Sequence, residues 1–331
     1  MIAFAAAISD VEAYERYAGP GIELAAEPDS EVFAYAAVGS ICRSYNLLLD
    51  LAAAREDLEA LVMVGQDTRI SDADLCRTVR RALADPGVGV VGCIGATGVR
   101  GMAWWEGNVS CGPVVHRYDK HGGGELTGFP WAAATAPLGE VDAVDGCLLV
   151  LSPWVVHNLR FDETLVPSHG WDVDFCRQVR AAGRTVVTAE LAAIRASSLE
   201  LIDEPELWAE AHVRFAEKWD GDGAASDEEW IARARRAEAE RDAARTVAYS
   251  TGLRIDARLL PLERQHDALT RTASWRLTAP LRRLNQLRRK ALLGERAADG
   301  RLRDDRLVRG DARPVPQARK ALGDGERARV G

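Results

Sequence analysis

The chain has 331 residues, of which 47% are hydrophobic and 28% charged, and this balance excludes a wholly disordered, collagen-like or disulfide-framework protein. The net charge of −8 is unevenly distributed: residues 261–331 carry 18 basic and 9 acidic side chains, which leaves 24 and 41 for residues 1–260. The acidic body argues against nucleic acid as a partner, and the basic tail suits an anionic surface or partner.

Short apolar runs alternate with helical patterns in the first third of the chain. The expected strands and helices, in chain order, cover residues 1–8, 11–17, 31–38, 40–54, 61–64, 71–83 and 88–94. This order predicts an α/β fold, in which a mainly parallel, Rossmann-like sheet carries helices on both faces.

A long irregular segment follows at residues 95–136, rich in Gly, Trp and His and without a clear period. A segment of about 40 residues that lacks secondary structure inside a compact domain is usually a binding loop or a lid. The alternation then resumes. We expect a strand at 141–150, a helix at 171–182, a strand at 184–194 and a helix at 205–219.

The domain organisation follows from a change in composition near residue 220. A Gly-, Asp- and Ala-rich break there ends the expected α/β domain, residues 1–220. A highly charged helix from 226 to about 249 makes residues 221–260 a helical linker. Residues 261–293 contain a further helix with basic and apolar side chains, and residues 294–331 are predicted to be disordered because they are charged and poor in aromatic residues.

The start of the chain is apolar but lacks the basic region of a secretory signal, and Ser9 and Asp10 follow at once. The sequence contains no run of about 18 apolar residues, and we therefore expect no membrane-spanning helix. We therefore expect a cytoplasmic protein.

Cysteine and histidine residues give little sign of a metal site. The six cysteines are widely spaced and form no C-x-x-C pair, which predicts buried free thiols in a reducing compartment. His116 and His121 are five residues apart in a Gly-rich stretch, but no third ligand is evident.

Two acidic residues stand where a parallel sheet would place a binding site. Asp67 follows the strand at 61–64, and ligands of open α/β sheets lie beyond the carboxyl ends of the strands. Its carboxylate could hold a divalent cation on a diphosphate, or only satisfy the amides of a turn. Asp172, in the first turn of an expected helix, could remove a proton from an acceptor hydroxyl, or only cap the helix. Asp174, two residues on, does not share its face.

Two further patterns allow a binding and a structural interpretation. Asp145 and Gly146 lie within an apolar run, where a glycine often marks close approach by a ligand or another backbone. Trp104, Trp105 and Glu106 combine aromatic rings with an acid, which suits a sugar, although the rings could instead pack the loop.

In their order and spacing these segments resemble family 2 glycosyltransferases with the GT-A fold, and more narrowly a bacterial branch, common in actinobacteria, that lacks the full D-x-D motif. The resemblance covers residues 1–220. It is carried by residues 44–46, 66–68, 92–107, 141–146 and 170–176.

The resemblance implies a nucleotide-sugar donor and a saccharide or lipid-linked acceptor. Asp67 matches the last Asp of D-x-D, which binds Mg²⁺ or Mn²⁺ and the donor diphosphate. Asp172 matches the base that activates the acceptor in an inverting displacement, and Asp145 matches an acid near the acceptor and the donor sugar. The other candidates are Asp10, Arg43 and Asn46 for the nucleotide, and Trp104, Trp105, Glu106, Gly146 and Trp171 for the acceptor or sugar.

The sequence departs from the family pattern at two positions. Gly65 stands where D-x-D has its first Asp, and residues 193–197 lack the His that often completes the metal shell in related chains. Arg195 lies in that stretch and could neutralise diphosphate charge directly. We therefore expect Mg²⁺ or Mn²⁺ as a cofactor, with weak or even dispensable metal dependence.

Residues 274–282 resemble an S-W-R-x-T-x-P-L-R segment that recurs in bacterial cell-surface polysaccharide enzymes. Beyond it, leucines share a stripe flanked by arginines, as in interfacial membrane helices. Residues 261–293 are therefore interpreted either as a peripheral contact with the inner face of the membrane, or as a helix that docks on the acidic body or on a protein partner.

Three functions compete on this basis. The first is a glycosyltransferase of cell-surface polysaccharide or glycolipid synthesis. The second is a GT-A-like binding or scaffold module that has lost catalysis, which the two departures keep open. The third, a nucleotidyltransferase, would need a Gly-rich phosphate loop after the first strand, and residues 8–11 offer none.

Overall fold

The computed structural model describes residues 1–118, 124–128, 134–165, 169–196, 205–219 and 229–272, together with residues 274, 277, 278 and 280. The chain divides into two units, Met1–Pro261 and Leu262–Gly331, and the division falls within one long helix. All of the candidate site residues belong to the first unit.

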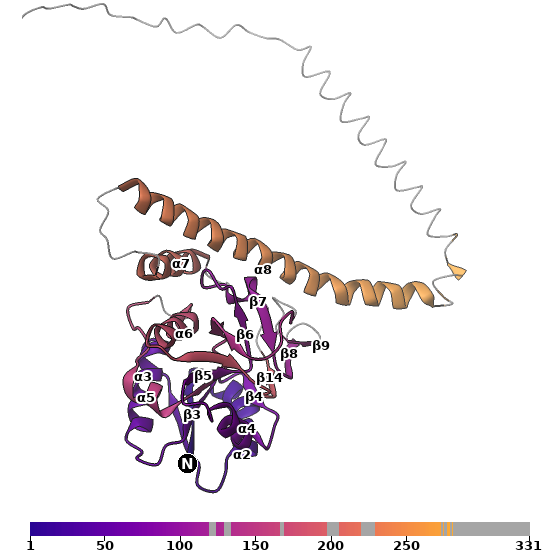
Figure 1. The fold of residues 1–331 in the computed structure, drawn as a ribbon. Helices are drawn as coiled ribbons and strands as arrows, with labels where there is room; N and C mark the ends of the chain where they lie inside the picture. Colours follow the sequence, from indigo (N-terminus) through magenta and orange to yellow (C-terminus); the bar gives the residue numbers. More distant parts are fainter. Residues whose placement is uncertain are drawn as a thin grey trace, which may run out of the picture. The chain divides into compact units, whose positions relative to one another are not determined.

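A seven-stranded sheet forms the centre of the first unit (Figure 1). Its strands, in spatial order, are β10 (Glu140–Val141), β13 (Thr185–Thr188), β5 (Val88–Gly92), β12 (Leu148–Leu151), β3 (Ala60–Val64), β1 (Ile2–Ile8) and β2 (Glu31–Ala36). Strands β2, β1 and β3 are parallel, as are β5 and β13, whereas β12 is antiparallel to both of its neighbours. The expected α/β fold with a mainly parallel sheet is confirmed.

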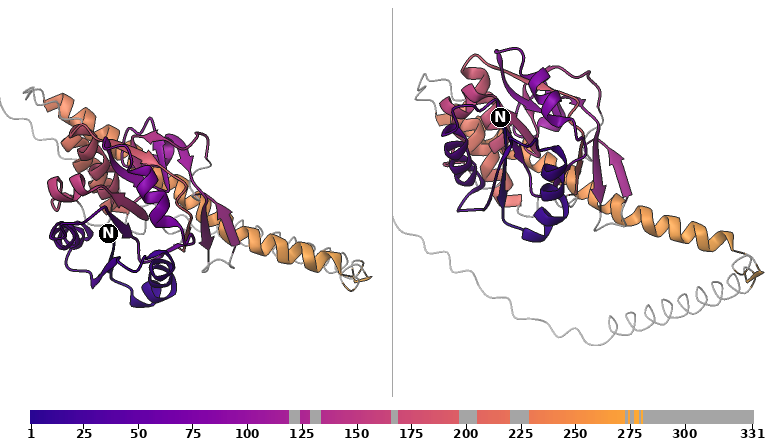
Figure 2. Two further views of the ribbon diagram at one scale, coloured as in Figure 1. Left: turned by 60° about the horizontal axis from the view of Figure 1, so that its bottom comes forward. Right: turned by 90° about the horizontal axis from the view of Figure 1, so that it is seen from below.

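The central strands are apolar throughout because helices cover both faces of the sheet. Every residue of β3, β5 and β12 is buried. The helices of the body are α1 (Val11–Ala13), α2 (Gly19–Ala25), α3 (Ile41–Ala53), α4 (Leu75–Ala82), α5 (Pro153–Asn158), α6 (Trp171–Ala181) and α7 (Pro205–Trp219), with a π-helical turn, η1 (Tyr14–Ala18), after α1. In Figures 1 and 2, α3, α5 and α6 lie on one side of the sheet, and α2 and α4 lie on the other.

The segment at 95–136 is more regular than the sequence indicates. Its described part contains the strands β6 (Ile94–Thr97), β7 (Asn108–Cys111), β8 (Val114–Tyr118) and β9 (Gly124–Thr127), and the 3-10 helix η2 (Trp104–Glu106). Strand β6 lies between β7 and β11 (Ala143–Val144) and pairs with both. Strands β8 and β9 extend β14 (Ala193–Arg195) and β4 (Thr68–Ile70). The expectation of an unstructured loop is wrong because strands of four or five residues are too short to show a period.

One helix, α8 (Glu229–Arg271), spans the region in which the sequence indicated two. It continues beyond Tyr249, where we expected it to end, because the single Gly252 is a weak helix breaker. Its buried residues Ala239, Ala243, Thr246 and Ser250 recur every three or four positions. This stretch of the expected linker 221–260 therefore packs as part of the first unit.

All six cysteines are free thiols, and each is buried except the half-buried Cys111. Within the described residues, no helix combines the length and the apolar content that membrane crossing requires. The basic stripe at 281–290, the expected disordered tail at 294–331, and His121 lie outside the described residues.

Candidate functional site

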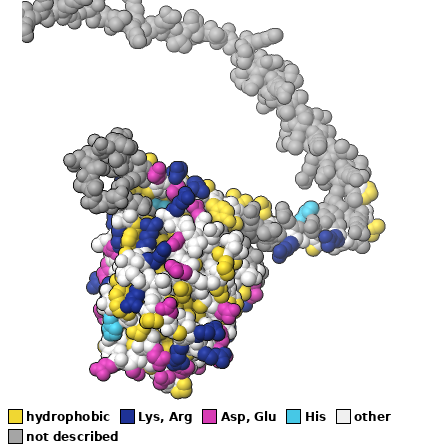
Figure 3. Space-filling model, in the orientation of Figure 1, with side chains coloured by type: hydrophobic (Ala, Val, Ile, Leu, Met, Phe, Trp, Pro, Cys, Tyr) yellow, Lys and Arg dark blue, Asp and Glu magenta, His cyan; other side chains and the backbone are white. Residues whose placement is uncertain are grey.

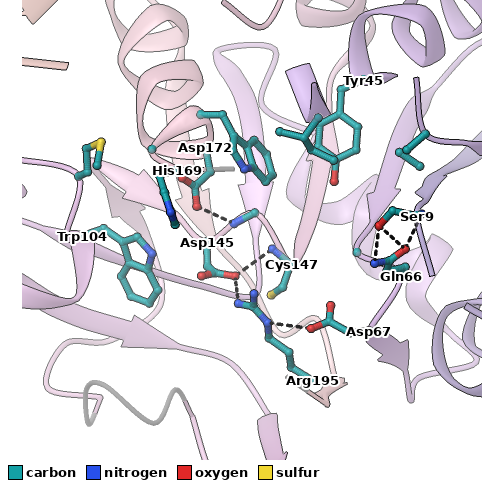
Figure 4. A pocket seen from close by; sticks show the side chains of 18 of the residues that line it. Ser9, Tyr45, Gln66, Asp67, Trp104, Asp145, Cys147, His169, Asp172 and Arg195 are labelled. Atoms are coloured by element: carbon teal, nitrogen blue, oxygen red, sulfur yellow. Dashed lines mark hydrogen bonds and ion pairs between the residues drawn. The ribbon is translucent and has the colours of Figure 1, made fainter. Parts of the chain in front are cut away.

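A cavity of about 570 Å³ lies beyond the carboxyl ends of β1 and β3, between the loop after β11 and the start of α6 (Figure 4). It brings together many of the residues singled out in the sequence, although they are up to 128 positions apart. Those that line it are Asp67, Trp104, Trp105, Asp145, Gly146, Trp171, Asp172 and Arg195.

Asp172 lies in the first turn of α6, which begins after Gly170 with a left-handed φ of 70°. Its Oδ2 accepts a hydrogen bond from the backbone N–H of Gly146 at 3.0 Å, and its Oδ1 accepts one from the N–H of Val173 at 2.9 Å. Burial of the carboxyl, and then the charge of Asp145, raise the pKa of Asp172 from 3.8 to about 7. A carboxyl with this pKa exchanges a proton readily near neutral pH.

Asp174 has a structural role instead. It is fully buried, and its carboxylate accepts from Nε2 of Gln178 at 2.8 Å and from Nε1 of Trp219 at 2.7 Å. Nζ of Lys218 lies 2.8 Å from the same carboxylate. These contacts join α6 to α7, and so the two acids, two positions apart, serve opposite sides of the helix.

Arg195 lies between two carboxylates at the floor of the cavity. Its Nη1 donates to Oδ1 of Asp145 at 2.7 Å, and its Nε lies 3.6 Å from Oδ2 of Asp67. Burial opposes the charge of the guanidinium, but Asp145 and Asp67 outweigh it and raise the pKa of Arg195. We therefore describe Asp67, Asp145 and Arg195 as the carboxylate–arginine cluster.

Strand pairing fixes the geometry of this cluster. β14 runs antiparallel to β4 with Arg195 opposite Thr68, and the N–H of Ala196 donates to the backbone oxygen of Asp67 at 2.9 Å. Asp145 is held by the N–H of Cys147, which donates to its Oδ1 at 2.9 Å. The guanidinium is thus placed by backbone register rather than by a flexible loop.

Gly146 is required by an aromatic ring. A Cβ at this position would lie 2.1 Å from a ring atom of Trp171, a distance that no folded protein tolerates. The ring of Trp171 also packs edge-on against Tyr45, with 5.0 Å between the centroids. The absence of a side chain lets the ring lie against the backbone whose N–H binds Asp172.

Trp104 and Trp105 pack against other aromatic rings and also line the cavity. Both line the cavity, yet Trp104 is only 1% exposed and packs edge-on against Trp105. Trp105 in turn stacks on Trp208 of α7, with 6.0 Å between the centroids. Glu106 is exposed and does not line this cavity.

Three of the expected nucleotide-binding residues lie outside the cavity wall. Asp10 caps α1 by accepting from the N–H of Ala13 at 3.0 Å. Asn46 is bound to the backbone of Phe161, donating to its oxygen at 2.9 Å and accepting from its N–H at 2.8 Å. Arg43 is exposed on α3.

The cavity is also lined by residues that were not among the site candidates from the sequence, namely Ser9, Tyr45, Gln66, His169 and Trp208. Oε1 of Gln66 accepts from the N–H groups of Ser9 and Asp10 at 2.8 and 2.9 Å, which joins the ends of β1 and β3. Ser9 and Gln66 directly follow two parallel strands, and this position could have identified them as residues of the cavity.

The described residues contain no group of three His, Cys, Asp or Glu side chains placed to hold a metal ion by themselves. His116 is buried in β8, where it lies opposite Arg195 in the register of β14.

Comparisons with known proteins show which family the chain resembles. The family described as "Glycosyltransferase like family" matches residues 3–217. The streptomycin biosynthesis protein StrF of Streptomyces griseus is 31% identical over 195 residues, which cover 58% of this chain and 64% of StrF. The chain thus matches under two thirds of the length of this relative.

Solved structures share lower similarity. A mannosyltransferase of Pyrobaculum calidifontis in complex with GDP-Man and Mn²⁺ is 12% identical, covering 83% of this chain and 81% of that chain, with a TM-score of 0.44. Protein A197 from STIV is 13% identical, covering 58% and 83% of the two chains, with a TM-score of 0.37. Because the family match extends over most of the α/β body, this chain belongs to the glycosyltransferase-like family, of the family 2 type with a GT-A-like fold.

Proposed function

We propose that this protein transfers a sugar from a nucleotide-sugar donor to a hydroxyl of an acceptor with inversion at the anomeric carbon. The observation that carries the proposal is the carboxyl of Asp172, with a pKa near 7, in the same cavity as the carboxylate–arginine cluster. Asp172 can accept a proton there, and the charged groups of the cluster line the same cavity, where they could bind a diphosphate leaving group and its cation.

In this reaction the acceptor oxygen attacks the anomeric carbon while the bond from that carbon to the diphosphate oxygen breaks. Asp172 takes the proton of the acceptor hydroxyl, and the bonding electrons leave with the diphosphate. The hydrogen bonds from Gly146 and Val173 fix the orientation of the Asp172 carboxylate, so that little reorganisation precedes proton transfer.

The donor set of the cavity fits a divalent cation that is shared with the diphosphate. Mg²⁺ is usually bound through one or two carboxylates together with substrate phosphates and water. Asp67 would supply that carboxylate. Gly65 leaves little room for a second, because a Cβ there would lie 3.2 Å from Oδ1 of Asp67 and 3.3 Å from the oxygen of Cys147. When bound, the ion would neutralise charge on the departing diphosphate.

The charge balance of the cluster supports a cation as well. Two carboxylates, Asp67 and Asp145, face the single guanidinium of Arg195, so the cluster is acidic before an anionic donor arrives. In the proposed mechanism Arg195 offsets part of this charge and holds Asp145 in place. We therefore propose that the cation enters with the donor.

A thermal-shift screen against UDP, GDP, dTDP and CDP, each with Mn²⁺ or with EDTA, tests the donor site. We expect one nucleotide to raise the melting temperature more with Mn²⁺ than with EDTA. Hydrolysis of the matching nucleotide-sugars then tests for catalysis. A nucleotide that binds without any hydrolysis or transfer would favour the scaffold alternative, and no binding to any nucleotide would contradict the donor site itself.

The acceptor has two candidate classes. The tail motif at 274–282 supports a polysaccharide or a lipid-linked acceptor at the membrane. The relative named for streptomycin biosynthesis supports a small-molecule acceptor instead. Liposome flotation of the full chain, compared with a chain that lacks residues 281–331, distinguishes them, because a membrane-bound acceptor requires the tail to associate with anionic vesicles.

A further inference from the structure

A groove of about 960 Å³ lies beside the cavity and shares Trp105 with it. One wall is formed by residues of the segment 97–108. The other carries Arg241, Arg245 and Tyr249 of α8. We call this hollow the α8 groove.

Small side chains bring α8 close enough to form this wall. Ala239, Ala243, Thr246 and Ser250 are each at most 6% exposed, and they recur at the spacing of one helix face. Because short side chains allow close approach of the helix, the neighbouring stripe of longer side chains reaches the groove. Tyr249, which is 49% exposed, also lines the groove.

The α8 groove is locally basic in a body that is acidic. Arg100, Arg241 and Arg245 line it, against Glu106 and Asp242. Asp242 is shared, with its Oδ1 lying 3.0 Å from Nη2 of Arg241 and 3.7 Å from Nη1 of Arg245. In Figure 3, Lys and Arg side chains lie at the upper end of the body, mixed with Asp and Glu side chains, and others lie lower on the same face. A local excess of guanidinium groups attracts an anion, and Arg binds phosphate and carboxylate groups bidentately.

The position of the groove assigns it to the acceptor side. In Figure 4, Ser9 and Gln66 lie at one end of the cavity and Trp104 at the other, with Asp145 and Asp172 between them. The groove opens at Trp105, next to Trp104, and therefore continues from the end opposite to Ser9 and Gln66. A donor nucleotide near the ends of β1 and β3 would leave this side open.

We propose that the α8 groove is an acceptor subsite that binds an anionic substituent, a phosphate or a carboxylate, of a saccharide acceptor. The inference rests on the proposed function for the reaction itself. Arg241 and Arg245 bind the anion, and Tyr249 and Trp105 contact the attached sugar.

Isothermal titration of the full chain, first alone and then saturated with the nucleotide selected in the thermal-shift screen and Mn²⁺, tests this subsite. The probes are trehalose 6-phosphate, digalacturonic acid and neutral trehalose. We expect at least one anionic probe to bind about tenfold or more tightly than trehalose. We expect the double variant Arg241→Ala/Arg245→Ala to lose that preference. Which anionic probe binds then identifies the anion as phosphate or carboxylate.

Arg236→Ala is the matched control, because Arg236 lies on the same helix, is exposed and pairs with Glu240 without lining the groove. Both replaced arginines are 63% exposed, so the double variant is expected to fold. Its unchanged response to the nucleotide would show that the donor cavity is intact.

Three results would overturn the subsite. The first is that the anionic probes bind no more tightly than trehalose. The second is that Arg236→Ala loses the preference for anionic probes as fully as the double variant, and the third is that the nucleotide displaces the probe. Failure of the proposed function gives a different result. In that case no nucleotide binds, while the probes still bind in a manner that depends on Arg241 and Arg245.

Discussion

The backbone N–H of Gly146 donates to Oδ2 of Asp172 at 3.0 Å, which joins the loop between β11 and β12 to the first turn of α6. The carboxylate is therefore oriented before any substrate binds. This hydrogen bond favours the ionised form, but burial and Asp145 outweigh it and leave the pKa of Asp172 near 7. The hydrogen bonds from Gly146 and Val173 thus orient the proposed base, and its burial next to Asp145 raises its affinity for a proton.

Replacing Asp172 with Asn removes the proposed base while keeping the shape of the side chain. We expect turnover of donor to fall about 100-fold or more, which is the usual contribution of a general base. Nucleotide binding, measured by thermal shift, should remain within about twofold, because Asp172 belongs to the acceptor side of the proposed mechanism. Turnover equal to that of the wild type would refute the assignment.

The pH dependence of the reaction should follow the same residue. Because Asp172 must be ionised to accept a proton and its pKa is about 7, kcat/KM should rise with pH up to about 7 and then level off. A rate measured between pH 5 and 9 checks this. A plateau that begins near pH 5 would show that another group is the base.

Stability should change with pH in the opposite sense. The pKa of Asp172 is raised in the folded protein from 3.8 to about 7, so between these values the folded state binds more protons than the unfolded state. Its contribution to the free energy of unfolding is therefore fully present at low pH and is lost as pH rises through about 7. Melting curves of Asp172→Asn should lack this component, and an unchanged pH profile in the variant would contradict it.

Asp174→Asn separates structural from catalytic acids on the same helix. It removes the charge that faces Lys218 and weakens the joint between α6 and α7, at an expected cost of about 2–4 kcal/mol in the free energy of unfolding. Urea denaturation measures this loss. Glu210→Gln is the control, because the exposed Arg214–Glu210 pair on α7 should contribute less than about 1 kcal/mol. Equal stability of the two variants would contradict the buried joint.

Gly146→Ala tests whether the ring of Trp171 requires a glycine. The added methyl group would overlap the ring, and overpacking of this kind costs about 1–3 kcal/mol. We expect lower turnover as well, because the N–H that binds Asp172 must shift. Gly252→Ala on α8, where a Cβ meets no atom within 4 Å, should lower neither. A Gly146→Ala variant as stable and active as Gly252→Ala would show that Trp171 moves away freely.

The sequence was sufficient for β1, β3 and β5, because buried strands leave uninterrupted apolar runs. The single strand expected at 141–150 is instead divided into β10, β11 and β12, which belong to two sheets. Asp67, Asp145, Asp172 and Arg195 could be brought to one cavity for a related reason, since each lies at the end of a strand or the start of a helix. Asn46 could not be placed, because its side chain is bound to the backbone of Phe161, 115 positions away. Long-range partners of this kind leave no local pattern.

The contribution of α8 was also hidden. Its buried stripe consists of Ala239, Ala243, Thr246 and Ser250. The alanines are too small, and the Thr and Ser too polar, to stand out in a hydrophobic pattern. The neighbouring charges of the helix indicated a solvated linker instead.

The small residues along α8 have an evolutionary consequence. The short buried side chains of α8 hold the helix against the body. The exposed positions beside them can therefore be exchanged without disturbing the sheet or the surroundings of Asp172. If the groove selects the acceptor, descendants of one ancestral enzyme could acquire new acceptors by substitutions confined to a single helix while keeping the same donor.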